Sequence, residues 1–409
     1  MQYFSIYDML LDKAILNNHN ENEMLNSLKK SGVSRGELQQ LKVSAYYPTN
    51  SLVLEGVLNY LQIDELMLNL SLGRIPSEYR GAYYSQISKI AEILTDASKS
   101  DVPPVKPLSV SYASPHGTLY HGDCRDVLRS VEDNSVDIIF ADPPFNLGKE
   151  YDEGISDQSS ITAYLNWSFE WIDECVRILK EGGYLFIYNL PKWCTYIAGY
   201  LNQHLTYWDW IALDMKYRLP ISGRLYPAHY ALIAYVKGNK PNTFNNQRVP
   251  LQTCRHCGGE IKDYGGYKGK MNPKGVNLSD VWADIYPVRH KTTKNRKYNE
   301  LPVKLLDRII MMASNEGDTI LDPFGGSGTT YAVAQLRGRK WIGCELGDCT
   351  VIASRLTNPR NDSRQLDKID EQKDVLFTAE TVKTRTKNGF WLPEDVCDSC
   401  SSSQTSLLI

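Results

Sequence analysis

Residues 318–336, DTILDPFGGSGTTYAVAQL, predict a short apolar strand, a glycine-rich turn and the start of a helix. A second apolar strand follows and ends at Glu345, 19 positions after Gly326. Glycines let a backbone approach a ligand at a helix N-terminus, and an acidic residue about 20 positions later accepts hydrogen bonds from the hydroxyls of a ribose. The stretch therefore predicts a nucleotide-type binding unit within an α/β sheet.

Three kinds of ligand compete for this unit: a nucleoside triphosphate, a dinucleotide and S-adenosylmethionine. A triphosphate-binding loop needs Lys before its Ser or Thr, whereas Gly328 is followed directly by Thr329. The dinucleotide fingerprint needs a third glycine at position 331, where this chain has Tyr331. A nucleoside triphosphate is therefore disfavoured and a dinucleotide is less favoured, and a tight turn that merely needs small residues is the alternative to a ligand site.

Apolar runs alternate with amphipathic helices around this unit, a pattern typical of a parallel sheet with helices on both faces. We expect an α/β fold with a doubly wound, mostly parallel, Rossmann-like sheet. The expected strands are 136–141, 183–188, 231–236, 319–322 and 340–345, and the expected helices are 161–180, 192–205 and 303–313.

Residues 7–94 show helical periodicity, and Ser34 with Glu37 predicts a capping box at the start of one helix. A DNA-binding helix-turn-helix and a helical hairpin used for packing both remain open. The organisation along the chain is a helical domain (1–96), a linker (97–118), a first half of the sheet domain (119–236), an inserted region (237–298), a second, cofactor-binding half (299–360) and a C-terminal extension (361–409).

Composition limits the other classes of function. The 409 residues carry 45 basic and 48 acidic side chains, a net charge of -3, so a nucleic-acid site must be a local patch. We find no apolar run of the roughly 20 residues that a membrane helix needs, and no signal-peptide pattern at the start. The nine cysteines do not suggest a disulfide framework. These features predict a cytoplasmic protein without a membrane partner.

A second motif, Asp142-Pro143-Pro144-Phe145, directly follows the apolar strand 136–141. Such a position lies at the carboxyl edge of the sheet, where open α/β proteins bind ligands. The two prolines stiffen the chain and lack N–H groups, so carbonyl acceptors stand beside one carboxylate and one aromatic ring. The motif suits a planar group that bears an amine, and a plain proline-stiffened strand exit is the alternative.

Together, DPPF at 142–145 and FGGSG at 324–328 resemble the amino-group DNA methyltransferases in their β-class motif order. The resemblance covers about residues 119–356. His121-Gly122-Asp123-Cys124 resembles the family's Gly-Asp motif, and residues 299–304 (NELPVK) resemble the segment that precedes the cofactor strand, without its usual leading His.

The resemblance implies that S-adenosylmethionine is the cofactor and that Glu345 binds its ribose, with Asp123 at its adenine. Further residues would surround its methionine part: Asp322, Phe324, Gly326, Gly328 and Thr329. The catalytic set would be Asp142, Pro143, Pro144 and Phe145, with Phe145 stacking on a flipped base.

Asp at the first position of the catalytic motif favours adenine N6 in double-stranded DNA as the target. A cytosine-N4 or RNA amino-methyltransferase and a non-catalytic DNA-binding protein of the same fold are the alternatives. The resemblance further implies a prokaryotic cell, and it leaves open a homodimer and a cognate restriction endonuclease as partners.

The inserted region occupies the place of this family's target-recognition region. Basic residues interleave with aromatic and polar ones at 262–270 and 289–297, which predicts contacts with DNA phosphates and bases, and a solvated loop is the alternative. Cys254 and Cys257, with Cys397 and Cys400, have the paired spacing of a zinc site. Because 140 residues separate the pairs, zinc binding requires that the fold close this gap, and reduced surface thiols beside a loose C-terminal tail are the alternative.

Overall fold

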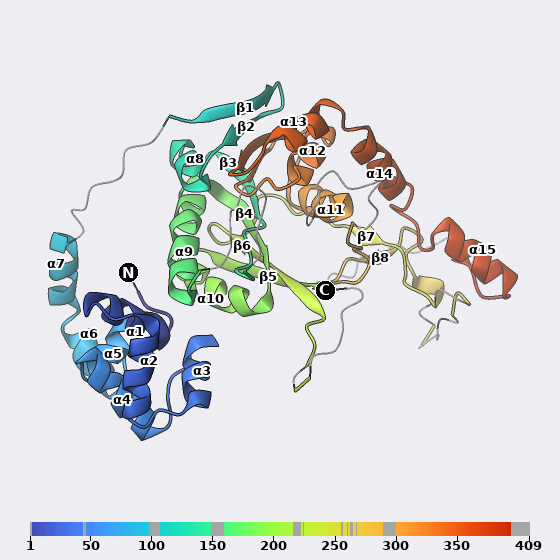
Figure 1. Cartoon of the computed structure of the whole chain (residues 1–409). Helices are drawn as coiled ribbons and strands as arrows, with labels where there is room; N and C mark the ends of the chain where they lie inside the picture. Colours follow the sequence, from blue (N-terminus) through green and yellow to red (C-terminus); the bar gives the residue numbers. More distant parts are fainter. Residues whose placement is uncertain are drawn as a thin grey trace. The chain divides into compact units, whose positions relative to one another are not determined.

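The structure is a computed structural model of the whole chain. It describes residues 2–43, 46–97, 107–148, 159–215, 222–223, 225–254, 257–259, 261, 265–266, 268–288 and 300–393. The chain divides into a helical unit, Met1–Pro107 with Pro144–Glu174, and a sheet unit, Leu108–Pro143 with Cys175–Ile409 (Figure 1).

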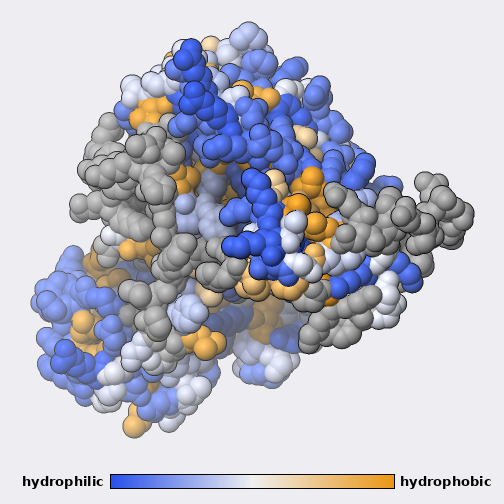
Figure 2. Space-filling model, turned by 90° about the vertical axis from the view of Figure 1, so that its right-hand side faces the viewer, coloured by the Kyte–Doolittle hydropathy of each residue, from blue (hydrophilic) through white to orange (hydrophobic). Residues whose placement is uncertain are grey.

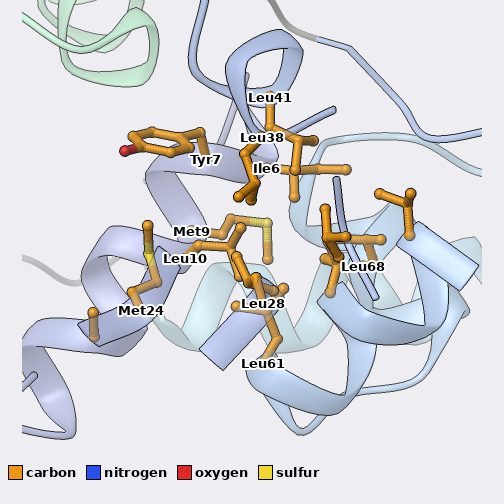
Figure 3. Packing of buried hydrophobic residues seen from close by; sticks show 14 of the residues in the cluster. Ile6, Tyr7, Met9, Leu10, Met24, Leu28, Leu38, Leu41, Leu61 and Leu68 are labelled. Carbon is orange, nitrogen blue, oxygen red and sulfur yellow. The ribbon is translucent and has the colours of Figure 1, made fainter. Parts of the chain in front are cut away.

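The helical unit is built from short helices around one apolar core. Leu10, Met24 and Leu28 are fully buried there, and Figure 3 shows them within one cluster of apolar side chains. Its helices are α1 (Ile6–Leu16), α2 (Glu21–Lys30), α3 (Arg35–Val43), α4 (Ser51–Leu61), α5 (Glu65–Ser71), η1 (Ser77–Tyr79), α6 (Arg80–Ser85) and α7 (Ile87–Ala97), joined by most of α9 (Ile161–Ile178).

The capping box predicted at the start of α3 is confirmed. The backbone N–H of Glu37 donates to Ser34 Oγ at 3.3 Å, and the backbone N–H of Ser34 donates to Glu37 Oε2 at 2.9 Å. The N-terminal segment is held to α9, because Thr162 N donates to the buried Asp8 Oδ2 at 2.8 Å and Phe4 N donates to Thr162 Oγ1 at 3.0 Å. Contact of this unit with DNA stays a prediction.

In the described part of the chain, the sheet unit contains a nine-stranded sheet in the order β1-β2-β11-β10-β3-β4-β6-β5-β9 (Figure 1). Neighbours from β2 to β4 are all parallel, whereas β1 and β6 run antiparallel to their neighbours. The strands are β1 (Ser109–Ser114), β2 (Gly117–His121), β3 (Val136–Ala141), β4 (Leu179–Asn189), β5 (Thr206–Asp214), β6 (His229–Val236), β9 (Val281–Trp282), β10 (Thr319–Asp322) and β11 (Lys340–Glu345).

The predicted α/β fold is confirmed, and β3, β10, β11 and α11 (Val303–Ala313) have the predicted bounds. The sheet is mostly parallel, as predicted, but it also has antiparallel pairs. The predicted strand 231–236 lies in β6, which is antiparallel to β4 and to β5, a strand that we did not predict. Antiparallel strands need no crossover helix, and the described residues between β5 and β6 contain none.

Several helices of the sheet unit follow its strands in the described part of the chain. The helix α8 (Cys124–Ser130) follows β2, and α10 (Pro191–Leu201) follows β4. After the glycine-rich turn comes α12 (Thr329–Leu336), and α13 (Thr350–Thr357) follows β11. The predicted helix 192–205 stops at Leu201, because the polar residues 202–204 continue as a turn.

The inserted region and the C-terminal extension add small elements to this unit. In the insert, β7 (Arg248–Val249) pairs with β8 (Val276–Asn277), and η3 (Lys268–Lys270) lies between them in the chain. The extension holds α14 (Arg360–Asp370) and α15 (Ala379–Lys387). The face drawn in Figure 2 is mostly hydrophilic, with apolar residues in small separate patches. Among the residues that the structure describes, no helix combines the length and apolar character needed to span a membrane.

Candidate cofactor and catalytic site

Four neighbouring parallel strands each lead into a carboxylate at the same edge of the sheet. In spatial order, β2 leads to Asp123, β11 ends at Glu345, β10 ends at Asp322 and β3 leads to Asp142. Parallel strands place their carboxyl ends together, so these side chains, which lie far apart in the sequence, share one edge. The structure therefore brings the predicted cofactor and catalytic motifs to adjacent strands.

The glycine-rich turn after β10 adopts a backbone that side chains would strain. Gly326 has φ 56° and Gly328 has φ 76°, both in the left-handed region. A Cβ at Gly328 would also lie 2.7 Å from Ile352 Cγ2 of α13. The turn is thus tightly packed against α13, and its conformation depends on glycine at these two positions.

Glu345 holds this turn through its carboxylate. Its Oε2 accepts the backbone N–H of Gly326 at 2.6 Å, and its Oε1 accepts that of Gly347 at 2.8 Å. Since a carboxylate has about four acceptor sites, each oxygen can accept a further hydrogen bond. Glu345 can therefore fix the turn and bind a ribose hydroxyl at the same time.

Asp322 is almost fully enclosed, with 2% of its surface exposed. Its Oδ1 accepts the N–H of Phe324 at 2.9 Å, and its Oδ2 accepts the Thr330 hydroxyl at 2.5 Å. Burial raises the pKa of Asp322 to about 7; these two hydrogen bonds lower it, and the Glu345 carboxylate raises it. In this structure Asp322 stabilises the turn from inside rather than from its surface.

Tyr331 occupies the position at which a dinucleotide-binding turn has its third glycine, and here the side chain has a structural role. Its buried hydroxyl donates to the carbonyl of Asp322 at 2.8 Å and accepts the N–H of Cys344 at 3.1 Å. Its ring fills the space above Gly343, where a Cβ would come within 2.6 Å of the ring. The Tyr331 side chain thus ties β10 to β11, with the missing side chain of Gly343 as its complement.

Asp123 begins α8 and is engaged by Arg125. The backbone N–H of Arg125 donates to Asp123 Oδ1 at 2.9 Å. The guanidinium Nη2 of Arg125 donates to Asp123 Oδ2 at 2.8 Å. Partial burial raises the pKa of Asp123, but these hydrogen bonds and the charge of Arg125 outweigh it, so the pKa lies below its usual value. Asp123 is therefore a stable anion at neutral pH.

The boundary between the two compact units falls within the predicted catalytic motif, between Pro143 and Pro144. Asp142 is half-buried and Pro143 buried at the end of β3 in the sheet unit. Pro144 and Phe145, both half-buried, belong to the helical unit, where the Tyr164 hydroxyl donates to the carbonyl of Pro144 at 2.8 Å. The motif thus occupies the predicted strand exit.

Arg355 of α13 is a buried residue of the site that sequence reasoning missed. It lies beneath the turn and forms ion pairs with Asp362 at 2.6 Å and with Glu300 at 3.1 Å. It also donates to Thr329 Oγ1 at 2.9 Å. No motif marks it in the sequence; only a basic residue within an otherwise apolar helix face hints at a buried ion pair.

Several predicted residues lie outside the described part of the chain. These are the basic stretch 289–297, residues 262–264 and 267 of the other basic stretch, and both cysteines of the second pair, Cys397 and Cys400. Cys254 and Cys257 are described and exposed. Among the described residues, no group of three or more His, Cys, Asp or Glu side chains could hold a metal ion.

Comparison with known proteins identifies the class of protein. A family model described as DNA methylase, for N6 and N4 methyltransferases, matches residues 136–352, more than half of the chain. The chain belongs to this family. It is therefore a DNA methyltransferase that acts on exocyclic amino groups, and the resemblance found in the sequence is confirmed.

Curated relatives agree with this assignment. The type II methyltransferase M.BamHI of Bacillus amyloliquefaciens is 52% identical over 97% of this chain and 94% of that protein. The type II methyltransferase M.HpaI of Haemophilus parainfluenzae is 35% identical over 54% of this chain and 67% of that protein. The DNA adenine methyltransferase YhdJ of Escherichia coli is 33% identical over 56% of this chain and 78% of that protein.

Proposed function

We propose that this chain transfers a methyl group from S-adenosylmethionine to adenine N6 of a flipped base in a specific duplex DNA site. One observation carries the proposal: the exit of β3 with Asp142 and Pro143 lies one strand away from the glycine-rich turn after β10. The neighbouring positions of these two strand exits support the pairing of a target-amine site with a cofactor site.

The residues on this edge fit the proposed cofactor. Its ribose hydroxyls match the open acceptor sites of Glu345, and its adenine amine matches the anionic Asp123. The turn at Phe324, Gly326 and Gly328 leads into the N-terminus of α12, and these residues would hold the methionine part. When bound, the cofactor supplies an electrophilic methyl group on a sulfonium.

The chain's own contribution is to hold the target amine. The Asp142 carboxylate and the Pro143 carbonyl would accept the two N–H groups, so that the nitrogen lone pair points away from the ring plane. The same two acceptors stabilise the positive charge that develops on the nitrogen. Phe145 would stack on the flipped base and replace the stacking lost from the duplex. No covalent bond to the chain is needed.

Adenine is our first choice of base for two reasons. Asp142 stands at the first position of the catalytic motif, and one relative is an adenine methyltransferase by name. Cytosine N4 is the second candidate, because its amine offers the same two N–H donors to Asp142 and Pro143 and the matched family covers both bases.

The experiment that tests this function is transfer of labelled methyl groups to duplex DNA, followed by nucleoside analysis. We expect N6-methyladenine, and label found only in N4-methylcytosine would contradict the choice of base. Asp142→Ala should lower transfer by about a hundredfold or more while cofactor affinity stays nearly unchanged, because the carboxylate acts on the amine. A wild-type protein that transfers no label to DNA would contradict the whole proposal.

The inserted region, residues 237–298, is our proposed DNA-reading region. Its described residues Lys268, Lys270 and Lys274 and the basic residues beyond 288 support this role. The type II names of the relatives support a restriction-modification role with a cognate endonuclease in a prokaryotic cytoplasm. A homodimer is a further proposal, to be tested by light scattering.

We also propose a zinc ion held by Cys254, Cys257, Cys397 and Cys400. In support, buried Arg385 of α15 donates to the carbonyls of Gly258, directly after Cys257, and of Trp391, each at 2.7 Å. This links the first pair to a residue six positions before Cys397. Metal analysis should find zinc in the wild type and none in Cys257→Ser; equal zinc content would contradict the site.

A further inference from the structure

The buried Arg355 cluster (Arg355, Asp362, Glu300, Ser327 and Thr329) joins three separate parts of the sheet unit. Asp362 comes from α14, Ser327 and Thr329 from the glycine-rich turn and the start of α12, and Glu300 from the segment before α11. The Arg355 and Asp362 side chains are 2% and 1% exposed, and that of Glu300 is 3% exposed.

The guanidinium of Arg355 donates hydrogen bonds on one side to Asp362 of α14 and on the other side to the glycine-rich turn. Its Nε and Nη2 both face Asp362, at 2.9 and 2.6 Å, in a two-pronged ion pair that fixes the guanidinium plane. Its Nη1 lies 3.0 Å from the carbonyl of Ser327 and 2.9 Å from Thr329 Oγ1. One side of the guanidinium is thus anchored, and the other side holds the turn.

A second link connects the turn to the preceding segment. Thr329 Oγ1 donates to the carbonyl of Leu301 at 3.1 Å, while Glu300, its neighbour, pairs with Nη1 of Arg355. The same helix that carries Arg355 also presents Ile352 beneath Gly328. One side chain therefore contacts both the turn and Glu300 of the preceding segment.

We propose that Arg355 is a positioning residue for the cofactor: it sets the glycine-rich turn and the Glu300–Leu301 segment in the arrangement that binds S-adenosylmethionine. The inference rests on the proposed function, because it assigns the turn to this cofactor. If Arg355 has this role, loss of its bidentate ion pair with Asp362 should weaken cofactor binding more than DNA binding.

The test compares Arg355→Lys with a matched control, Arg337→Lys. Arg337 also pairs with two carboxylates, the buried Asp307 at 2.6 Å and the exposed Asp370 of α14 at 2.8 Å, but neither belongs to the turn. Lysine keeps the charge at both positions and loses the planar fork. Both variants should melt at a lower temperature than the wild type.

Only Arg355→Lys should alter cofactor binding. Equilibrium binding of S-adenosylhomocysteine should weaken by about tenfold or more, as expected for the loss of one charge-assisted hydrogen bond, whereas Arg337→Lys stays within about twofold. In the methyl-transfer assay, Arg355→Lys should raise KM for the cofactor and leave KM for DNA unchanged. Equal dissociation constants for the two variants would show a purely structural role and overturn the proposal.

Ser327→Ala decides the matter if Arg355→Lys does not fold. It removes one acceptor on the turn side and leaves the ion pair with Asp362 intact. We expect binding of S-adenosylhomocysteine to weaken about threefold to tenfold, and unchanged binding would overturn the proposal. A wild-type protein that does not bind this probe would contradict the proposed function as well, whereas normal binding by both variants would contradict the inference alone.

Discussion

At the scale of single residues, the carboxylates on the sheet edge have different tasks. Glu345 and Asp322 both accept backbone N–H groups of the glycine-rich turn, but Asp322 is enclosed and Glu345 is half-buried. A carboxylate that is enclosed stabilises the turn, and one that reaches the surface can also contact a ligand. Substitution of Glu345 is therefore expected to affect cofactor binding, and substitution of Asp322 is expected to affect stability.

Glu345→Ala should weaken cofactor binding by about 1 to 3 kcal/mol, because it removes acceptors for the ribose and leaves the N–H groups of Gly326 and Gly347 unpaired. Glu345→Gln, which keeps one acceptor oxygen, should lose less. Equilibrium binding of S-adenosylhomocysteine measures both variants, with Asp142→Ala as the control of unchanged affinity. A dissociation constant for Glu345→Ala equal to that of the wild type would refute the assignment.

Asp322 should make the stability of the protein depend on pH. Its pKa of about 7 in the folded state lies above that of an unfolded chain, about 3.9. The folded state therefore binds the extra proton. The contribution of Asp322 to stability is fully present below about pH 3.9 and is lost as the pH rises to about 7.

Asp322→Asn mimics the protonated acid and should remove this slope. Between pH 5 and pH 8 we expect the wild type to lose about 1 to 4 kcal/mol relative to Asp322→Asn. Urea unfolding of the cofactor-free protein at both pH values is the measurement. A constant difference between the two proteins across this range would argue against a raised pKa.

At the scale of elements, strand β11 and helix α12 fit together through one glycine. A Cβ at Gly343 would press into the Tyr331 ring, so Gly343→Ala should destabilise the protein by about 1 to 3 kcal/mol through overpacking. Gly199→Ala in α10 is the control: a Cβ there meets nothing within 4 Å, and alanine favours a helix. Thermal unfolding should separate the two, and equal melting temperatures would contradict the packing argument.

At the scale of the whole molecule, a chain with a net charge of -3 must bind a polyanion through a local basic surface. Lys294, Arg296 and Lys297 in the insert are the proposed phosphate-binding side chains, although they lie outside the described residues. Replacing all three with neutral side chains should reduce the steepness of the plot of log affinity against log salt concentration. The reduction is up to about 0.9 for each phosphate contact that is lost, and cofactor binding should not change. A wild-type slope would mean that other residues bind the phosphates, with the helical unit as the next region to test.

The sequence alone determined the fold class and the two motifs of this methyltransferase. Strand β10, the glycine-rich turn and Glu345 are local features, because apolar runs and glycine requirements act over a few residues. The strand before Asp142 was predictable for the same reason. The C-terminal edge of a parallel sheet then follows from the pattern, which explains why both motifs were assigned to one site.

Only the tertiary structure decided which distant residues support that site. The antiparallel direction of β6 depends on the path of the chain after β5, which periodicity does not encode. Arg355 became visible only when Asp362, Glu300 and the turn surrounded it, because a buried ion pair is a property of packing between elements. The role of Tyr331 is likewise visible only in the structure, where its ring packs against Gly343 of strand β11.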